Sequence, residues 1–321
     1  MRFITSVLVA ATLLFPSAAR CQTFPIPGKP IRIIVPFGAG GGADHQARVI
    51  AQGIAETIGV PVVIENRPGA GSQIGTREVQ RAAPDGHTLL YQIAAIVQLP
   101  LMSRTSVWNI FDDFTPITYL VRSHVVLSAH VSAPFNTVAE MIAYAKANPG
   151  KLSYASFGVG TSAHLNGEYL KLLAGIDVVH IPYRVSGDAM RDHLSGNVLL
   201  SFDGPTTAIA NLNTGRVKIL ATAAEQRNPM LPNVPTLRET GFNVGRSAYN
   251  GLWGPPGLPP AVAEAIHAHV AKALQRPTIR DVLEKTGNEV LGTSPADMLR
   301  EVKSAHEYWS KLIPQLGITV D

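Results

Sequence analysis

The chain has 321 residues, of which 46% are hydrophobic and only 16% are charged, so a disordered protein is excluded and two cored domains are possible. The formal net charge of +4 is small, and the basic residues are scattered, which argues against a nucleic-acid partner but suits a small anion. Because Cys21 is the single cysteine, no intramolecular disulfide can form.

The N-terminus has the order of a secretory signal peptide, which we expect to cover residues 1–21. Arg2 supplies the positive charge, residues 3–15 form an apolar run too short for a membrane anchor, and small residues follow. Cys21 lies beside the cleavage point, but Arg20 stands where a lipoprotein signal needs a small residue, so lipidation is the less favoured interpretation. We therefore expect a soluble, exported protein.

The first part of the mature chain alternates strands and helices. A β-branched strand is predicted at residues 31–35, and the glycine loop Gly38-Ala39-Gly40-Gly41-Gly42 then leads into a helix expected at 43–58. The pattern continues with a strand at 61–65, a second glycine loop at 66–71, a helix at 72–82 and a strand at 88–91. This order predicts a parallel sheet with helices on its faces.

A second α/β unit begins near residue 125. Strands are predicted at 125–129, 152–156, 178–181, 198–202 and 218–222. Helices are predicted from Thr137 to about 148, from the end of the segment 157–164 to about 174, at 187–194 and after Pro205. The segment 157–164 repeats the design of 37–44, in which a strand is followed by phenylalanine, glycines and a helix, so the second unit has its own glycine loop.

The C-terminal part contains a proline-rich strap at 252–260 and three predicted helices, at 261–275, 278–286 and 295–312. These helices have no strands with which to form a third domain, so they are expected to pack on the first unit. The chain then crosses twice between units, and we predict a hinged pair of domains around a central cleft. Their expected limits are residues 22–125 with 248–321, and residues 126–247.

The first glycine loop also matches a dinucleotide fingerprint. Residues 38–43 fit G-x-G-x-x-G/A, and Glu65 stands where a ribose-binding acid would. Export from the cytoplasm and the rigid, bulky Pro36-Phe37 pair argue against a nicotinamide cofactor. Two glycine loops at helix N-termini on different domains are better suited to clamping a small anion through backbone amides.

No hydrolase, zinc-protease or Walker motif is present, so we expect no catalysis, no metal site and no cofactor. His45 and His164 follow the two glycine loops, and cleft-lining and structural roles both remain open. Asp44 is suited either to capping its helix or to meeting a polar ligand group. Asp203, at a strand end, is suited equally to contacting a ligand and to holding its own loop.

Ordered segments of the sequence match one known family over nearly the whole mature chain: 29–37, 40–42, 63–71, 83–86, 154–156, 180–183, 202–203 and 232–236. They resemble the Bug receptors, the TctC-like substrate-binding proteins of tripartite tricarboxylate transporters. The resemblance implies an α/β periplasmic binding protein of type II, a Venus-flytrap fold. Such a protein traps a small organic carboxylate between two domains and presents it, as a monomer, to membrane permease subunits.

Carried over residue by residue, the resemblance implies a ligand site that draws on both glycine loops, with Asp203 contacting the distal part of the ligand. The expected site residues are Phe37, Gly40, Gly41, Ala43, Asp44, Gly71, Gln92, Ser156, Phe157, Gly158, Thr161, Ser162, His164, Tyr183 and Asp203.

The sequence departs from the family pattern at several of these loops. Gly38 replaces the usual Pro, Ala43 the usual Thr or Ser, and Phe157 a small polar residue, while Arg184-Val185-Ser186 replaces Lys-Gly-Gly. An apolar wall of Phe37 and Phe157 favours a carboxylate with an aromatic or apolar body, or a dicarboxylate, over citrate. A second interpretation of Phe157, as a packed hinge residue, remains open. Two alternative functions also remain open: a sensory module that signals to a membrane kinase, and an exported enzyme.

Overall fold

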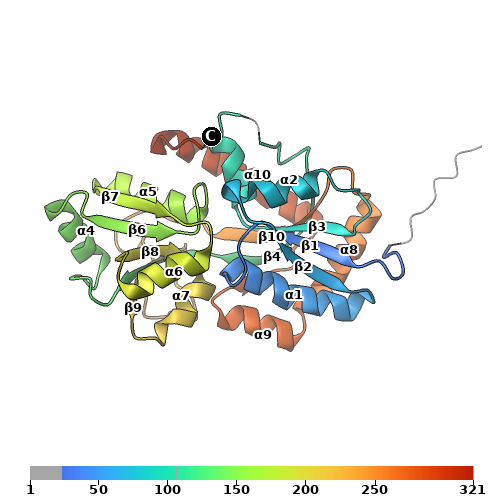
Figure 1. Ribbon diagram of the computed structural model, residues 1–321, viewed down its shortest axis with the longest axis horizontal. Helices are drawn as coiled ribbons and strands as arrows, with labels where there is room; N and C mark the ends of the chain where they lie inside the picture. Colours follow the sequence, from blue (N-terminus) through green and yellow to red (C-terminus); the bar gives the residue numbers. More distant parts are fainter. Residues whose placement is uncertain (1–23, 106, 321) are drawn as a thin grey trace, which may run out of the picture.

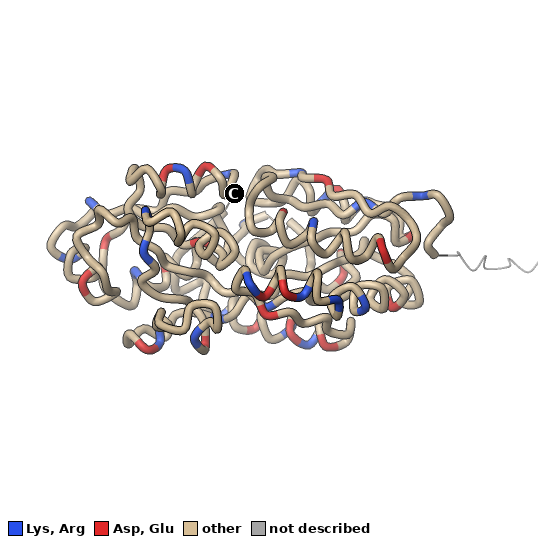
Figure 2. Tube along the Cα trace, turned by 90° about the horizontal axis from the view of Figure 1, so that it is seen from below, with Lys and Arg blue, Asp and Glu red and all other residues tan. Residues whose placement is uncertain are grey.

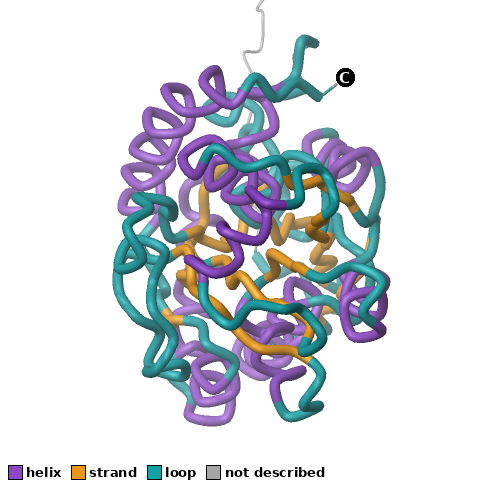
Figure 3. Tube along the Cα trace, turned by 90° about the vertical axis from the view of Figure 1, so that its left-hand side faces the viewer, coloured by secondary structure: helices purple, strands orange, loops and turns teal. Residues whose placement is uncertain are grey.

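Two separate β-sheets organise the computed structural model, which describes residues 24–105 and 107–320. The expected signal peptide and Cys21 lie outside the described residues. The sheets belong to two lobes that lie side by side (Figure 1), and an end-on view shows strands in the interior with helices around them (Figure 3). We call the lobe that contains β1 the first lobe and the other the second lobe.

The sheet of the first lobe is mixed, with strand order β11-β4-β10-β3-β1-β2. Its strands are β1 (Ile31–Val35), β2 (Val62–Asn66), β3 (Thr88–Gln92), β4 (Thr115–Ser123), β10 (Ala248–Gly254) and β11 (Glu289–Val290). β1 pairs in parallel with β2 and β3, whereas β10 is antiparallel to both β3 and β4. The parallel half was predicted from the sequence and is confirmed.

The sheet of the second lobe has the order β7-β6-β8-β5-β9. Its strands are β5 (Val125–His130), β6 (Leu152–Ser156), β7 (Val178–Pro182), β8 (Leu200–Asp203) and β9 (Val217–Ala223). β6 is parallel to β7 and β8, and β5 is antiparallel to β8 and β9. A single residue, His124, joins β4 to β5, and the chain returns to the first sheet between β9 and β10. The residue limits that we predicted for the two domains stay predictions.

The helices cover both sheets (Figure 1). Those of the first lobe are α1 (Gly42–Ile58), the short 3-10 turn η1 (Ala70–Ser72), α2 (Gln73–Gln80), α3 (Ala95–Met102), α8 (Pro260–Leu274), α9 (Pro277–Lys285) and α10 (Pro295–Leu316). Those of the second lobe are α4 (Val138–Ala147), α5 (Ser162–Ala174), α6 (Ser186–Ser195) and α7 (Pro205–Leu212). The three C-terminal helices pack on the first lobe as expected, and α10 also contacts α5 of the second lobe.

Each sheet has a core of its own. In the first lobe, the buried face of α1 contributes Ile50 and Ile54, which belong to one cluster with Ile33 of β1 and Ile266 of α8. A second cluster in the same lobe joins Trp253 of β10 to α3 and α10. The second lobe is built around Leu127, Phe135, Leu152 and Tyr154. Apolar residues at helical spacing on α1 therefore bury against alternating strand residues, as the periodicity predicts.

The C-terminal strap prediction was wrong in its first part. Residues 252–254 are the end of strand β10, and the proline-rich segment begins only at Pro255. Pro255 thus ends the strand without removing a hydrogen bond from its interior. The short strand β11 between α9 and α10 was also missed, and so were α3 and β4. β10 and β11 depend on pairing with strands more than a hundred residues away, which local patterns do not reveal.

None of the helices within residues 24–105 and 107–320 combines the length and the apolar character needed to cross a bilayer. Lys and Arg alternate with Asp and Glu over both lobes (Figure 2). The described surface therefore resembles that of a globular protein with mixed charge, as the composition predicts.

The close packing of α5 on β6 gives a prediction for stability. A Cβ atom on Gly167 would lie 2.6 Å from Cζ of Tyr154, whose side chain is fully buried. Gly167→Ala should therefore destabilise the fold by roughly 1 to 3 kcal/mol, because overpacking outweighs the better helix propensity of alanine. The measurement is the denaturation midpoint in urea. Gly187→Ala, a helical glycine with no atom closer than 4.0 Å, is the control and should be neutral or slightly stabilising; equal effects of the two changes would contradict the packing argument.

Candidate ligand-binding site

The two glycine loops have the same backbone geometry. Gly40 (φ 82°) and Gly160 (φ 79°) adopt left-handed conformations one residue before the extended N-cap residues Gly41 and Thr161. α1 then begins at Gly42 and α5 at Ser162. The first amides of each helix have no partner within the helix and carry the partial positive charge of its N-terminus. The repeat that the sequence predicted is therefore present in backbone detail.

The third residue of each helix holds its own loop. The Asp44 Oδ2 atom accepts a hydrogen bond from the Gly40 amide at 2.9 Å, and His164 Nδ1 accepts one from the Gly160 amide at 3.2 Å. Burial alone would raise the pKa of Asp44, but hydrogen bonds from Arg48, the Gly40 amide and Asn66 outweigh it and lower that pKa. Both side chains thus hold the conformation of their loops. This is a structural role, and the sequence had left it open beside a role in lining the cleft or meeting the ligand.

A central cavity lies between the two lobes, with an empty volume of about 630 Å³ that includes the part open to solvent. Its lining comes from the first lobe, the crossing segment and the second lobe: Phe37, Gly41, Gly42, Ala43, Gln46, Ile93, Ser123, His124, Val125, Phe157, Ser162, Ser186, Asp203, Gly204, Thr206, Ala248 and Asn250. The N-terminal residues of α1, α5, α6 and α7 all contribute to its wall.

Six of the predicted site residues line this cavity, namely Phe37, Gly41, Ala43, Phe157, Ser162 and Asp203. Phe37 and Phe157 also line a neighbouring outer cavity of about 760 Å³, together with the predicted residues Gly71, Gly158, Thr161 and Tyr183. The two phenylalanines therefore stand between the central and the outer cavity, and the expected apolar wall is present.

Other predicted residues lie near the cavity without lining it. Gly40 borders a separate depression with Ser186 and Met190. Gln92 is buried, donates to the hydroxyls of Ser72 and Thr76 and accepts from the Ile93 amide, so it fixes α2 against β3. The Ser156 hydroxyl lies 2.7 Å from His180 Nε2. His45, one of the two candidate histidines, is exposed on α1.

A buried polar network beside the cavity was not predicted from the sequence. Gln46 Oε1 accepts hydrogen bonds from the Tyr91 hydroxyl at 2.5 Å and from Asn250 Nδ2 at 2.8 Å. Gln46 Nε2 donates to Asn288 Oδ1 at 3.0 Å and to the Thr206 hydroxyl at 3.3 Å. Gln46 lies on the expected buried face of α1, where a polar residue without hydrogen bonds would be costly. A glutamine on this apolar face was the one feature of the sequence that could have indicated the network.

Hydrogen bonds at residues that line the cavity join the two lobes. Thr206 of the second lobe accepts from Gln46 and Asn288 of the first lobe. Gln98 Nε2 donates to the Ser162 hydroxyl at 3.0 Å. All five side chains that make these contacts are buried. The structure is therefore a closed arrangement, in which direct hydrogen bonds join the lobes.

Stacked histidines behind the glycine loop at 157–161 give a pH prediction. The rings of His164 and His180 stack with centroids 4.1 Å apart, and burial lowers their pKa values to about 4 and about 3. Each side chain is an ordinary histidine in the unfolded chain, with a pKa near 6.5, so the unfolded state binds more protons between these values. This pair should therefore lower the free energy of unfolding by several kcal/mol as the pH drops from about 7 toward 4, while the raised pKa of Asp203 acts in the opposite direction over the same range.

Urea denaturation between pH 8 and pH 4 measures this effect. His180→Phe should reduce the acid loss, because the phenyl ring keeps the stack but takes up no proton. The control His45→Gln removes an exposed histidine and should keep the full acid loss. Identical pH profiles of the unmodified protein and His180→Phe would contradict the prediction.

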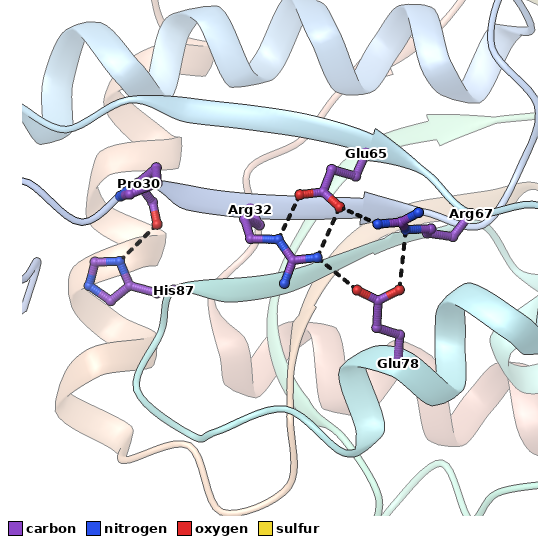
Figure 4. A network of polar contacts seen from close by, with 6 residues as sticks. All are labelled: Pro30, Arg32, Glu65, Arg67, Glu78 and His87. Atoms are coloured by element: carbon purple, nitrogen blue, oxygen red, sulfur yellow. Dashed lines mark hydrogen bonds and ion pairs between the residues drawn. The ribbon is translucent and has the colours of Figure 1, made fainter.

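Glu65, the acidic residue that the dinucleotide interpretation requires for ribose binding, is occupied by ion pairs. The Glu65 carboxylate accepts from Arg32 at 2.6 and 2.9 Å and from Arg67 at 2.9 Å, and Glu78 completes a network of four charged side chains (Figure 4). Hydrogen bonding from Arg32 is the main reason that the pKa of Glu65 is lowered. Glu65 thus fixes the edge of the sheet and the start of the second glycine loop. Among the described residues, no group of three or more His, Cys, Asp or Glu side chains is placed to hold a metal ion.

Comparison with known proteins agrees with this geometry. Residues 46–318 match the family model of the tripartite tricarboxylate transporter family receptor. The chain is 34% identical to the UPF0065 protein in the tcbD-tcbE intergenic region of Pseudomonas sp. (strain P51), over 100% of this chain and 95% of that protein.

Two solved structures are similar over nearly their whole length. Periplasmic binding protein BugD has a TM-score of 0.87 at 32% identity, covering 92% of this chain and 99% of its own. R. palustris Rpa4515 with adipate also has a TM-score of 0.87, at 30% identity, covering 91% and 99%. The fold is that of the periplasmic binding proteins, as the sequence predicted. With a family model that matches most of its length, this chain belongs to the tripartite tricarboxylate transporter family receptors, a family of solute-binding proteins.

Proposed function

We propose that this protein is a periplasmic receptor that closes its two lobes on a small organic carboxylate and delivers it to membrane permease subunits. The observation that carries this proposal is the central cavity, because the first residues of α1 and of α5, whose amides have no partner within their helix, line it from opposite lobes. Family membership and the adipate in the related R. palustris structure support it.

The expected binding energy is compatible with such a role. About four charge-assisted hydrogen bonds, each of roughly 1.5 to 3 kcal/mol, sum to roughly 6 to 12 kcal/mol before ordering costs, a range that includes the roughly 8 kcal/mol of micromolar affinity. The apolar part of the wall, which includes Phe37, Ile93, Val125 and Phe157, favours a ligand with an apolar or aromatic body. Thr206, Ser186 and Asn250 add polar groups that fix its orientation.

A thermal-shift panel tests the proposal. The mature protein is heated with mono-, di-, tri- and aromatic carboxylates, adipate included, with amino acids and with NAD(P). A carboxylate at about 100 times its dissociation constant should stabilise the native state by about 2.7 kcal/mol, which raises the melting temperature by several degrees. A rise with NAD(P) alone, or steady turnover of a carboxylate by the pure protein, would reject the receptor function. Loss of uptake of the bound carboxylate in a deletion strain tests delivery.

A further inference from the structure

The central cavity contains almost no positive charge. None of its lining residues is lysine or arginine, and its only titratable side chains are Asp203 and His124. His124 Nε2 lies 2.8 Å from Asn228 Nδ2, a donor, and burial lowers the pKa of His124 to about 4. This imidazole is therefore neutral near pH 7. Attraction for an anion comes from the backbone amides at the helix N-termini, each of which carries about half a positive charge.

Asp203 is a buried carboxyl group with one oxygen unused. It ends β8, is 5% exposed, and its Oδ1 accepts a hydrogen bond from the Gly204 amide at 2.6 Å. Its Oδ2 has no partner within residues 24–105 and 107–320, and the residue lines the cavity. Burial raises the pKa of Asp203 to about 7, against the opposing hydrogen bond from Gly204. Near neutral pH the group can therefore carry a proton.

No neighbouring charge compensates this carboxyl group. The elements packed against β8 are β5, β6, α5 and α6. Their titratable side chains are His130, Tyr154, His164, Glu168, Tyr169, Lys171, Asp188, Arg191, Asp192 and His193. None of these lines the cavity, and none contributes to the shift in the pKa of Asp203. Only His124 shares the cavity with it.

We propose that a second carboxylate enters the central cavity only together with a proton that it shares with Asp203. Two ionised carboxylates without a cation between them repel each other, whereas one proton between them forms a strong O–H···O⁻ hydrogen bond. The first carboxylate occupies the amides of α1 and α5, and the second faces Oδ2 of Asp203. This inference rests on the proposed receptor function and specifies the charge state of its ligand.

Proton balance sets the expected pH dependence. Below about pH 7 the free protein already carries the required proton on Asp203, so dicarboxylate affinity is constant while the ligand is a dianion. Above that pH one proton must be taken up from solution, and the dissociation constant rises about tenfold per pH unit. A half-amide of the same length has no second charge, and its NH₂ group donates to Asp203. Its affinity therefore changes little with pH.

Isothermal titration with matched ligands tests the proposal. Succinate, glutarate, adipate, terephthalate and their half-amides are titrated at pH 6.5, 7.5 and 8.5. At pH 8.5 the half-amide of the best-bound diacid should bind at least tenfold more tightly than the diacid. Asp203→Asn, which mimics the protonated group, should abolish the pH slope and bind the dianion at least tenfold more tightly at pH 8.5 than the unmodified protein. Asp177→Asn, an exposed acid of the same lobe, should keep the slope.

Two outcomes overturn the proposal while leaving the receptor function intact. One is a diacid that binds as tightly at pH 8.5 as at pH 6.5 in the unmodified protein, a measurement that does not depend on any variant. The other is binding of monocarboxylates alone at every pH. If no carboxylate of any class binds, the proposed function fails and this inference fails with it.

Discussion

Gly38→Val should weaken carboxylate binding at least tenfold while the melting temperature of the ligand-free protein stays within a few degrees. A Cβ atom on Gly38 would lie 2.9 Å from Cγ1 and 3.0 Å from Cγ2 of Val185. Gly38 follows β1 in the first lobe, and Val185 precedes α6 in the second. The clash therefore arises only when the lobes close, at a cost of roughly 1 to 3 kcal/mol. Isothermal titration with the most tightly bound carboxylate measures this loss of affinity.

The matched control removes the opposing side chain. Val185→Gly in the Gly38→Val background should restore most of the lost affinity, so the two changes should be non-additive. Unchanged affinity in Gly38→Val would show that ligand binding does not require this contact.

Thr206→Val should weaken carboxylate binding about tenfold and shift the ligand-free protein toward a more open form. The Thr206 hydroxyl of α7 accepts hydrogen bonds from Gln46 Nε2 at 3.3 Å and Asn288 Nδ2 at 3.0 Å, both from the first lobe. Valine has the same shape but leaves these buried donors facing a methyl group, which costs roughly 1 to 3 kcal/mol in the closed form alone.

Titration gives the affinity, and small-angle X-ray scattering of the ligand-free protein gives the radius of gyration, which should increase. Thr207→Val is the control, since the adjacent hydroxyl makes no hydrogen bond to the first lobe among the described residues. Equal affinities of the two variants would mean that the Thr206 hydrogen bonds do not stabilise closure.

The glycine loops could be predicted from the sequence because their conformation requires glycine. Gly40 and Gly160 adopt positive φ angles that other residues rarely take, and each stands between a β-branched or apolar strand and a helix. Local patterns also gave β1 and α1 within a residue or so of their ends. These elements contain their own signals and need no distant partner to be recognised.

The side chains that complete the cavity could not be found in this way. Gln46, Thr206 and Asn250 come from α1, α7 and β10, and only the packing of the two lobes brings them together. Asp44, Ser156 and His164 were placed at the right loops, but the direction of a side chain depends on which backbone amide or ring lies nearest. In each case that partner belongs to the loop itself or to β7.

The most direct test of the central claim is a crystal structure of the protein with the carboxylate that gives the largest thermal shift. The account predicts a closed protein in which one carboxylate group lies about 2.7 to 3.2 Å from amides in the first turns of both α1 and α5. A carboxylate bound outside the central cavity, or in contact with only one lobe, would contradict the account.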